Sequence, residues 1–183
     1  MNNLSQTQKC FMLTVNGKGR IPKMNYGEIH SALYTAGVLE LISGRFIDKV
    51  EDDKIDITQP LSCSHLYLKP LYNYIADQDE PQTMECLAQF VADYEKFAEY
   101  FSAIGESLVN MGFPKDDEAT KMRDELTVTE IIDEYSNNCH PLAKTIFDHA
   151  MKHAPSWLSA PQHKCDANFE SYKPFIGVKG VIF

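Results

Sequence analysis

The segment from Glu28 to Ser43 constrains the fold more than any other, because it is apolar on nearly every face when drawn as a helix. Its apolar residues are Ile29, Ala32, Leu33, Ala36, Val38, Leu39, Leu41 and Ile42. A helix that is apolar all round is enclosed by protein or spans a membrane. The segment is shorter than the roughly 20 apolar residues that a span needs, and Glu28, His30 and Glu40 interrupt it. It therefore predicts the central buried helix of one domain.

The residues that follow predict the end of this helix and a small hairpin. Gly44 fits the C′ position, where a left-handed backbone ends a helix. We expect short strands over 45–50 and 54–58, around the acidic turn 51–53. In the second strand apolar and polar residues alternate with the period of two that is typical of strands.

The rest of the chain predicts further helices around this one. Apolar spacing favours helices over 4–15, 64–77, 83–91, 93–111, 127–135 and 141–153. A hairpin over 11–21 is an alternative for the first, because Asn16-Gly17 favours a tight turn, and 83–111 could form one helix or two. The polar stretch 113–125 is predicted to be a flexible loop. We therefore expect residues 1–183 to form a single domain, mainly α, with one or two small β-hairpins.

The charge and the cysteine content limit which partners and which cellular location fit this chain. The net charge is −9 and the pI is about 5.1, which argues against a nucleic-acid partner and, to a lesser degree, against adhesion to anionic lipid. The five cysteines have no CxxC spacing, and residues 1–8 lack the apolar run of a signal peptide. These features favour free thiols in a cytoplasmic protein.

A helix followed by a hairpin is also the ending of a winged-helix unit. A DNA-reading helix needs basic and polar side chains on its outer face. Residues 28–43 contain no Lys or Arg, and the wing would carry Glu51, Asp52 and Asp53. DNA binding is therefore not favoured, and a winged-helix-like regulator or protein-interaction module remains the alternative function.

Candidate catalytic and metal-binding residues are few. His149 and His153 share a helix face, and Cys139, His140, His163 and Cys165 could add ligands, but the spacings match no zinc signature. Glu40 is a carboxylate in an apolar helix, with Arg45 near it in sequence. Such a group is either a functional-site candidate or, as we favour, an exposed residue or a structural ion pair. No nucleotide-binding or hydrolase motif is present, so we expect no enzyme, no metal and no cofactor.

Three segments resemble the Golgi phosphoprotein family, whose eukaryotic members bind phosphatidylinositol 4-phosphate. They are FMLTVNGKGRIP at 11–22, the stretch 31–57 that contains ALYTAGVLELISGRF, and 66–112 with LYLKPLYNYI and FAEYFSAIGESLVNMG. The likeness covers somewhat over half of the chain, and its third segment is similar to the shorter bacterial members. It implies a mainly helical single domain with small hairpins.

The resemblance also implies a function. It suggests a non-enzymatic domain that is cytoplasmic or peripheral to a membrane, with an anionic phospholipid or a protein as partner. Asn25 and Tyr34 stand where the family has a headgroup-binding Trp and Arg, so that site is not carried over. We predict Arg20, Lys23 and Arg45 as headgroup-binding residues, because they lie near the ends of the central helix.

Overall fold

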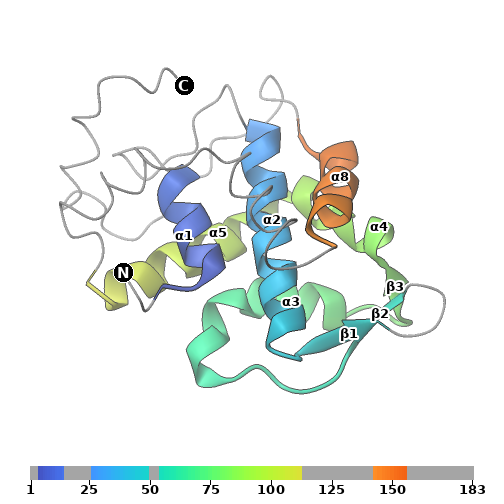
Figure 1. Cartoon of the computed structure of the whole chain (residues 1–183), viewed down its shortest axis with the longest axis horizontal. Helices are drawn as coiled ribbons and strands as arrows, with labels where there is room; N and C mark the ends of the chain where they lie inside the picture. Colours follow the sequence, from blue (N-terminus) through green and yellow to red (C-terminus); the bar gives the residue numbers. More distant parts are fainter. Residues whose placement is uncertain (1–3, 15–25, 50–53, 113–141, 156–183) are drawn as a thin grey trace.

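The computed structural model describes residues 4–14, 26–49, 54–112 and 142–155 (Figure 1). These residues are mainly α-helical, with one small antiparallel sheet. Helix α2 (Tyr26–Ser43) runs through the middle of the molecule. The predicted fold class, mainly α around a central buried helix, is confirmed.

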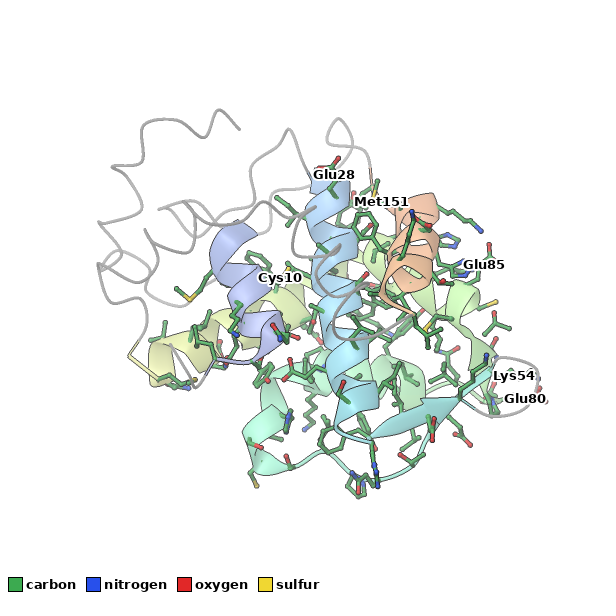
Figure 2. The ribbon with its side chains drawn as sticks, viewed as in Figure 1. Cys10, Glu28, Lys54, Glu80, Glu85 and Met151 are labelled. Carbon is green, nitrogen blue, oxygen red and sulfur yellow. The ribbon has the colours of Figure 1, made fainter. Side chains whose placement is uncertain are left out.

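Helix α2 is enclosed because other helices cover it on several sides. It packs against α1 (Gln6–Thr14), α8 (Ala143–His153), α3 (Lys69–Ala76) and the 3-10 helix η4 (Ala88–Ala92). All residues from 29 to 39 are buried. In Figure 2, Glu28 lies at one end of α2, where its side chain is exposed. This burial removes α2 as a surface that could read DNA.

Two of the polar residues inside α2, Thr35 and His30, are accommodated by a hydrogen bond and by stacking. Thr35 Oγ1 donates to the Ser31 carbonyl at 2.7 Å. The ring of His30 lies 3.1 Å (Nδ1) from the Val91 carbonyl oxygen, and it stacks on Phe97 at a centroid distance of 3.7 Å. A buried polar group costs free energy unless it is paired, so these contacts let α2 pass through the core.

The end of α2 differs from the prediction by one residue. The left-handed conformation is taken by Arg45, with φ 59°, and not by Gly44. The Arg45 amide donates to the Ile42 carbonyl and the Phe46 amide to the Leu41 carbonyl, both at 2.9 Å, which is the Schellman pattern of a helix end. Gly44 is needed for space, because a Cβ there would lie 2.4 Å from the ring of Phe46.

The predicted hairpin is present and has a third strand beside it. Strands β1 (Ile47–Lys49) and β2 (Lys54–Ile57) pair antiparallel, with Ile47 opposite Ile57. Strand β3 (Gln82–Thr83) pairs with β2, so the sheet order is β1-β2-β3. The sequence did not predict β3, because two residues are too few to show a period.

The region predicted as one helix over 64–77 is two helices. A 3-10 helix, η3 (Cys63–Leu68), precedes α3, and His65 within it has the non-helical angles φ −117° and ψ 16°. Pro70 lies in the first turn of α3, as expected of a residue without an amide hydrogen. The change of helix type turns His65 and Tyr67 toward α2, which matters for the site described below.

The segment 83–111 also divides into separate helices. The helix α4 (Met84–Leu87) leads into η4, and α5 (Tyr94–Asn110) begins after Asp93, whose carboxylate accepts from the Lys96 amide at 3.1 Å. Four aromatic residues of this region are buried in the core: Phe90, Phe97, Tyr100 and Phe101.

Helix α1 confirms the helical alternative for the first segment. Ser5 and Gln8 form a capping box: the Gln8 amide donates to Ser5 Oγ at 3.2 Å, and the Ser5 amide donates to Gln8 Oε1 at 3.0 Å. The predicted loop at 113–125 and the predicted helix at 127–135 lie outside the described residues. Across the four described ranges, no helix is long and apolar enough to span a membrane.

Three of the five cysteines can be placed. Cys10 is buried, Cys63 and Cys86 are exposed, and all three are free thiols, as predicted. Burial raises the pKa of the Cys10 thiol to about 12, because an apolar interior disfavours the charged thiolate. Only the two exposed thiols of this set are therefore expected to react with alkylating reagents in the folded protein.

Candidate functional site: the cavity beside Glu40

A cavity of about 680 Å³ opens where α1, η3 and the C-terminal end of α5 meet the last turns of α2. We call it the Glu40 cavity. Its lining residues are Leu4, Ser5, Gln8, Glu40, Cys63, Ser64, His65, Leu66, Tyr67, Ser107, Asn110 and Met111. Polar groups from four separate elements therefore converge on one space.

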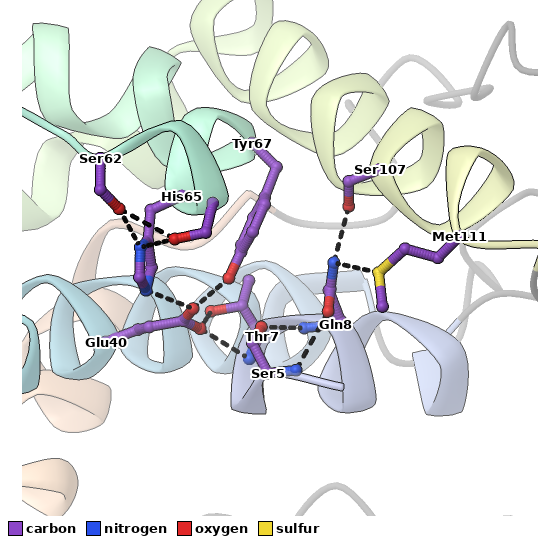
Figure 3. Close-up of polar contacts among 10 residues, drawn as sticks. Ser5, Thr7, Gln8, Glu40, Ser62, His65, Tyr67, Ser107 and Met111 are labelled. Atoms are coloured by element: carbon purple, nitrogen blue, oxygen red, sulfur yellow. Dashed lines mark hydrogen bonds and ion pairs between the residues drawn. The ribbon is translucent and has the colours of Figure 1, made fainter. Parts of the chain in front are cut away.

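Glu40 is the centre of this convergence, and its side chain is only 9% exposed. Thr7 of α1 donates to Glu40 Oε2 twice, from its hydroxyl at 2.7 Å and its amide at 3.2 Å. The Tyr67 hydroxyl of η3 donates to Oε1 (Figure 3). The carboxylate thus ties α1 and η3 to α2. Glu40 is therefore not an exposed residue. Its hydrogen-bond partners are Thr7 and Tyr67, and the imidazole at ion-pair distance is that of His65, not the guanidinium of Arg45.

His65 lies at ion-pair distance from the same carboxylate but does not form a hydrogen bond with it (Figure 3). Its Nε2 is 3.9 Å from Glu40 Oε1, which is too long for a hydrogen bond. Its Nδ1 is 2.7 Å from Ser62 Oγ and 3.0 Å from Ser64 Oγ. A hydrolytic triad requires an imidazole that is hydrogen-bonded to the carboxylate. The imidazole-to-carboxylate hydrogen bond of such a triad is not formed between His65 and Glu40 in this structure.

Gln8 fixes the opposite wall of the cavity. Its side-chain amide donates to Ser107 Oγ at 3.0 Å and to Met111 Sδ at 3.5 Å, which joins α1 to α5 (Figure 3). The capping box holds the carbonyl end of the same Gln8 side chain. This wall is therefore ordered by hydrogen bonds before any ligand arrives.

Two of the exposed residues that line the cavity are large and apolar. Leu66 is 53% exposed and Met111 is 41% exposed, and both line the space. Leu4 adds a buried apolar surface. Single exposed apolar residues are ordinary, but two large ones at the mouth of a polar cavity offer a surface for the apolar part of a ligand.

The hydroxyl of Tyr67 is held in its neutral form. Its pKa is raised well above the ordinary value, first by burial and then by the neighbouring charge of Glu40 and the hydrogen bond to it. Both causes disfavour a phenolate next to a carboxylate. Tyr67 therefore acts at this site as a hydrogen-bond donor.

Of the three residues predicted to bind a headgroup, Arg45 is the one that the structure describes. Arg45 is exposed and does not line the Glu40 cavity. Arg20 and Lys23 lie outside the described residues, as does Asn25. Tyr34 is fully buried, so the position that the family resemblance assigns to a headgroup arginine faces the core here. Glu40 stands out in the sequence as a carboxylate in an apolar helix. Nothing in the sequence around Thr7, His65 and Tyr67 indicates that they lie close to it.

A second polar cluster lies between α4 and α8. Glu85 is 2.7 Å from Lys152 Nζ and 3.9 Å from His149 Nδ1, beside a smaller cavity of about 380 Å³. The hydrogen bond from Lys152 is the main cause that lowers the pKa of Glu85. Among the described residues, no group of three or more His, Cys, Asp and Glu side chains could hold a metal ion. Cys139, His140, His163 and Cys165 lie outside those residues.

The described residues form a mainly helical domain. Its cavity is open to solvent and has polar groups at its base. Comparisons of this chain with protein-family models, with curated proteins and with solved structures find no match.

Proposed function

We propose that this protein is a non-enzymatic binding domain whose Glu40 cavity holds a small amphipathic molecule. The convergence of polar groups on the cavity base beneath the exposed Leu66 and Met111 carries this proposal. Ligand sites are concave, with apolar surface and a few placed polar groups that fix orientation. The Glu40 cavity has both parts.

The polar base is also preorganised. Glu40 is held by Thr7 and Tyr67, and Gln8 is held by Ser5 and Ser107. Ligand binding therefore causes little further loss of conformational entropy in these side chains. Met111 at the rim is unbranched and polarisable, and such a side chain adapts to ligands of different shape.

Alkylation of cysteines tests where ligands bind. Cys63 lines the Glu40 cavity and Cys86 does not, while both are exposed. We expect amphipathic fragments that bind the protein to slow iodoacetamide alkylation of Cys63. The slowing should be about tenfold at ten times the Kd. Alkylation of Cys86 in the same sample, measured by mass spectrometry of peptides, should not change.

Two results would contradict the proposal. Fragments that bind but protect both cysteines equally would show that the cavity is not the site. A fluorophosphonate probe that labels Ser64 would contradict the non-enzymatic part, because such labelling requires an activated serine.

Binding to an anionic phospholipid, as a peripheral membrane or protein adaptor, is the second candidate. It rests on Arg45, which is exposed at the C-terminal end of α2 and forms no ion pair with any other residue that the structure describes. Arg20 and Lys23 complete the predicted set. We expect the protein to sediment with liposomes containing an anionic phospholipid at low salt. Arg45→Ala should reduce that binding, and physiological salt should weaken it. Equal sedimentation with neutral liposomes would contradict this candidate.

A further inference from the structure

We infer that the polar end of the ligand is a protonated primary amine, which donates a hydrogen bond to Glu40 Oε1 in the Glu40 cavity. This inference rests on the proposed function, because it assigns a chemical class to the molecule that the cavity binds. Three independent features of the described residues support it.

The first feature is an unused acceptor position. An ionised carboxylate offers about four acceptor positions. Glu40 Oε2 accepts from the Thr7 hydroxyl and amide, while Oε1 accepts from the Tyr67 hydroxyl alone. The remaining position is on Oε1, the oxygen that lies 3.9 Å from His65 Nε2. A hydrogen-bond donor of the ligand at this position would occupy the last acceptor position of the carboxylate.

The second feature is charge. All the hydrogen-bond donors to Glu40 are neutral, and no Lys or Arg is among the described residues that line the cavity. The imidazole of His65 lies 3.9 Å from Oε1 and adds a positive charge only when it is protonated. A largely buried carboxylate favours a cationic partner. The net charge of −9 also draws cations and repels anions. An ammonium group therefore fits this cavity, and a phosphate or carboxylate group does not.

The third feature is the position of the two exposed apolar residues. Leu66 and Met111 line the same space as Glu40 and remain exposed. An alkyl chain attached to the ammonium group can cover them and remove apolar surface from water. Affinity should then rise by about fourfold for each methylene that is buried.

The test compares three probes of equal length: hexylammonium, hexanol and hexanoate. Binding is followed by protection of Cys63 from iodoacetamide, with Cys86 as the internal reference. We expect hexylammonium to protect Cys63 at the lowest concentration and hexanoate to protect it least. Glu40→Gln keeps the shape of the side chain and removes its charge, so it should weaken hexylammonium binding by about tenfold to a hundredfold. It should weaken hexanol binding less than hexylammonium binding, because a hydroxyl can donate to Oε1 but carries no charge.

A second comparison needs no variant and therefore no assumption about folding. Hexyltrimethylammonium has the same charge and chain as hexylammonium but no N–H donor. We expect it to bind the unmodified protein at least about tenfold more weakly, because it cannot donate to Oε1.

The outcomes separate the two proposals. If hexanol or hexanoate protects Cys63 as well as hexylammonium does, the amine assignment is overturned while the binding function stands. If hexyltrimethylammonium binds as tightly as hexylammonium, the inference that the ligand donates a hydrogen bond to Oε1 is overturned. If no hexyl probe and no amphipathic fragment protects Cys63, both proposals are overturned.

Discussion

Gly37→Val is expected to destabilise the fold by about 3 kcal/mol, because the centre of α2 has no room for a side chain. A Cβ at this position would lie 2.2 Å from Tyr100 Oη and 2.8 Å from Leu71 Cδ2. Tyr100 is fully buried, and its hydroxyl donates to the Leu33 carbonyl at 2.9 Å. The new side chain must displace this ring and break its hydrogen bond, which adds about 1 kcal/mol. Urea unfolding followed by circular dichroism measures the loss.

Two variants serve as controls for this prediction. A Cβ at Gly112 would meet nothing within 4 Å, and φ there is 77°, so Gly112→Ala should cost only about 1 kcal/mol of backbone strain. Tyr100→Phe removes the oxygen nearest to the new atom, so Gly37→Ala with Tyr100→Phe should cost less than the sum of the two single changes. If Gly37→Val were as stable as the unmodified protein, α2 would not be packed against α3 and α5 as described.

The second large effect is expected when Glu40 loses its hydrogen-bond partners. Thr7→Val and Tyr67→Phe keep the shape of each side chain and remove the two hydroxyls that donate to the carboxylate. The double variant leaves a carboxylate that is only 9% exposed with the Thr7 amide as its remaining donor. Breaking a buried charged interaction in this way costs about 3–5 kcal/mol. Thermal and urea unfolding should both record the loss.

A triple variant shows whether the charge is the cause. Adding Glu40→Met to the double variant removes the carboxylate itself, and replacing all partners by apolar groups of similar shape costs little. The triple variant should therefore be more stable than the double variant, by about 2 kcal/mol or more. If it is equally unstable or less stable, packing rather than an unpaired charge explains the loss.

Much of this fold could be predicted from periodicity alone. The apolar character of 28–43 predicted the buried central helix, and the alternation after residue 54 predicted the second strand of the hairpin. Both signals are local and repeat over several residues, so they can be read from the sequence. The third strand spans only Gln82–Thr83, and it exists because β2 lies beside it in space. The residue with a left-handed backbone was also predicted one position too early. The glycine at position 44 is required for another reason, because a side chain on Gly44 would collide with the ring of Phe46.

The candidate site was predictable only in part. Glu40 stood out as a carboxylate within an apolar helix, and this signal correctly marked an unusual position. Its hydrogen-bond partners are Thr7 and Tyr67, which lie 33 and 27 positions away from it along the chain. No single residue type identifies such a pair, since threonine and tyrosine are common on helices. The prediction of Arg20, Lys23 and Arg45 for a lipid site rested on their nearness to the helix ends. Arg45 does not line the cavity.

The most direct test of the account follows the methionine methyl groups by NMR during a titration with hexylammonium. Met111 lines the Glu40 cavity and is 41% exposed, whereas Met151 on α8 is 38% exposed and does not line it. We predict a saturating shift of the Met111 signal and none of the Met151 signal. In Glu40→Gln the Met111 shift should need about tenfold to a hundredfold more hexylammonium. Equal shifts of both methyl groups, or no shift of Met111 at any concentration, would contradict a binding site beside Glu40.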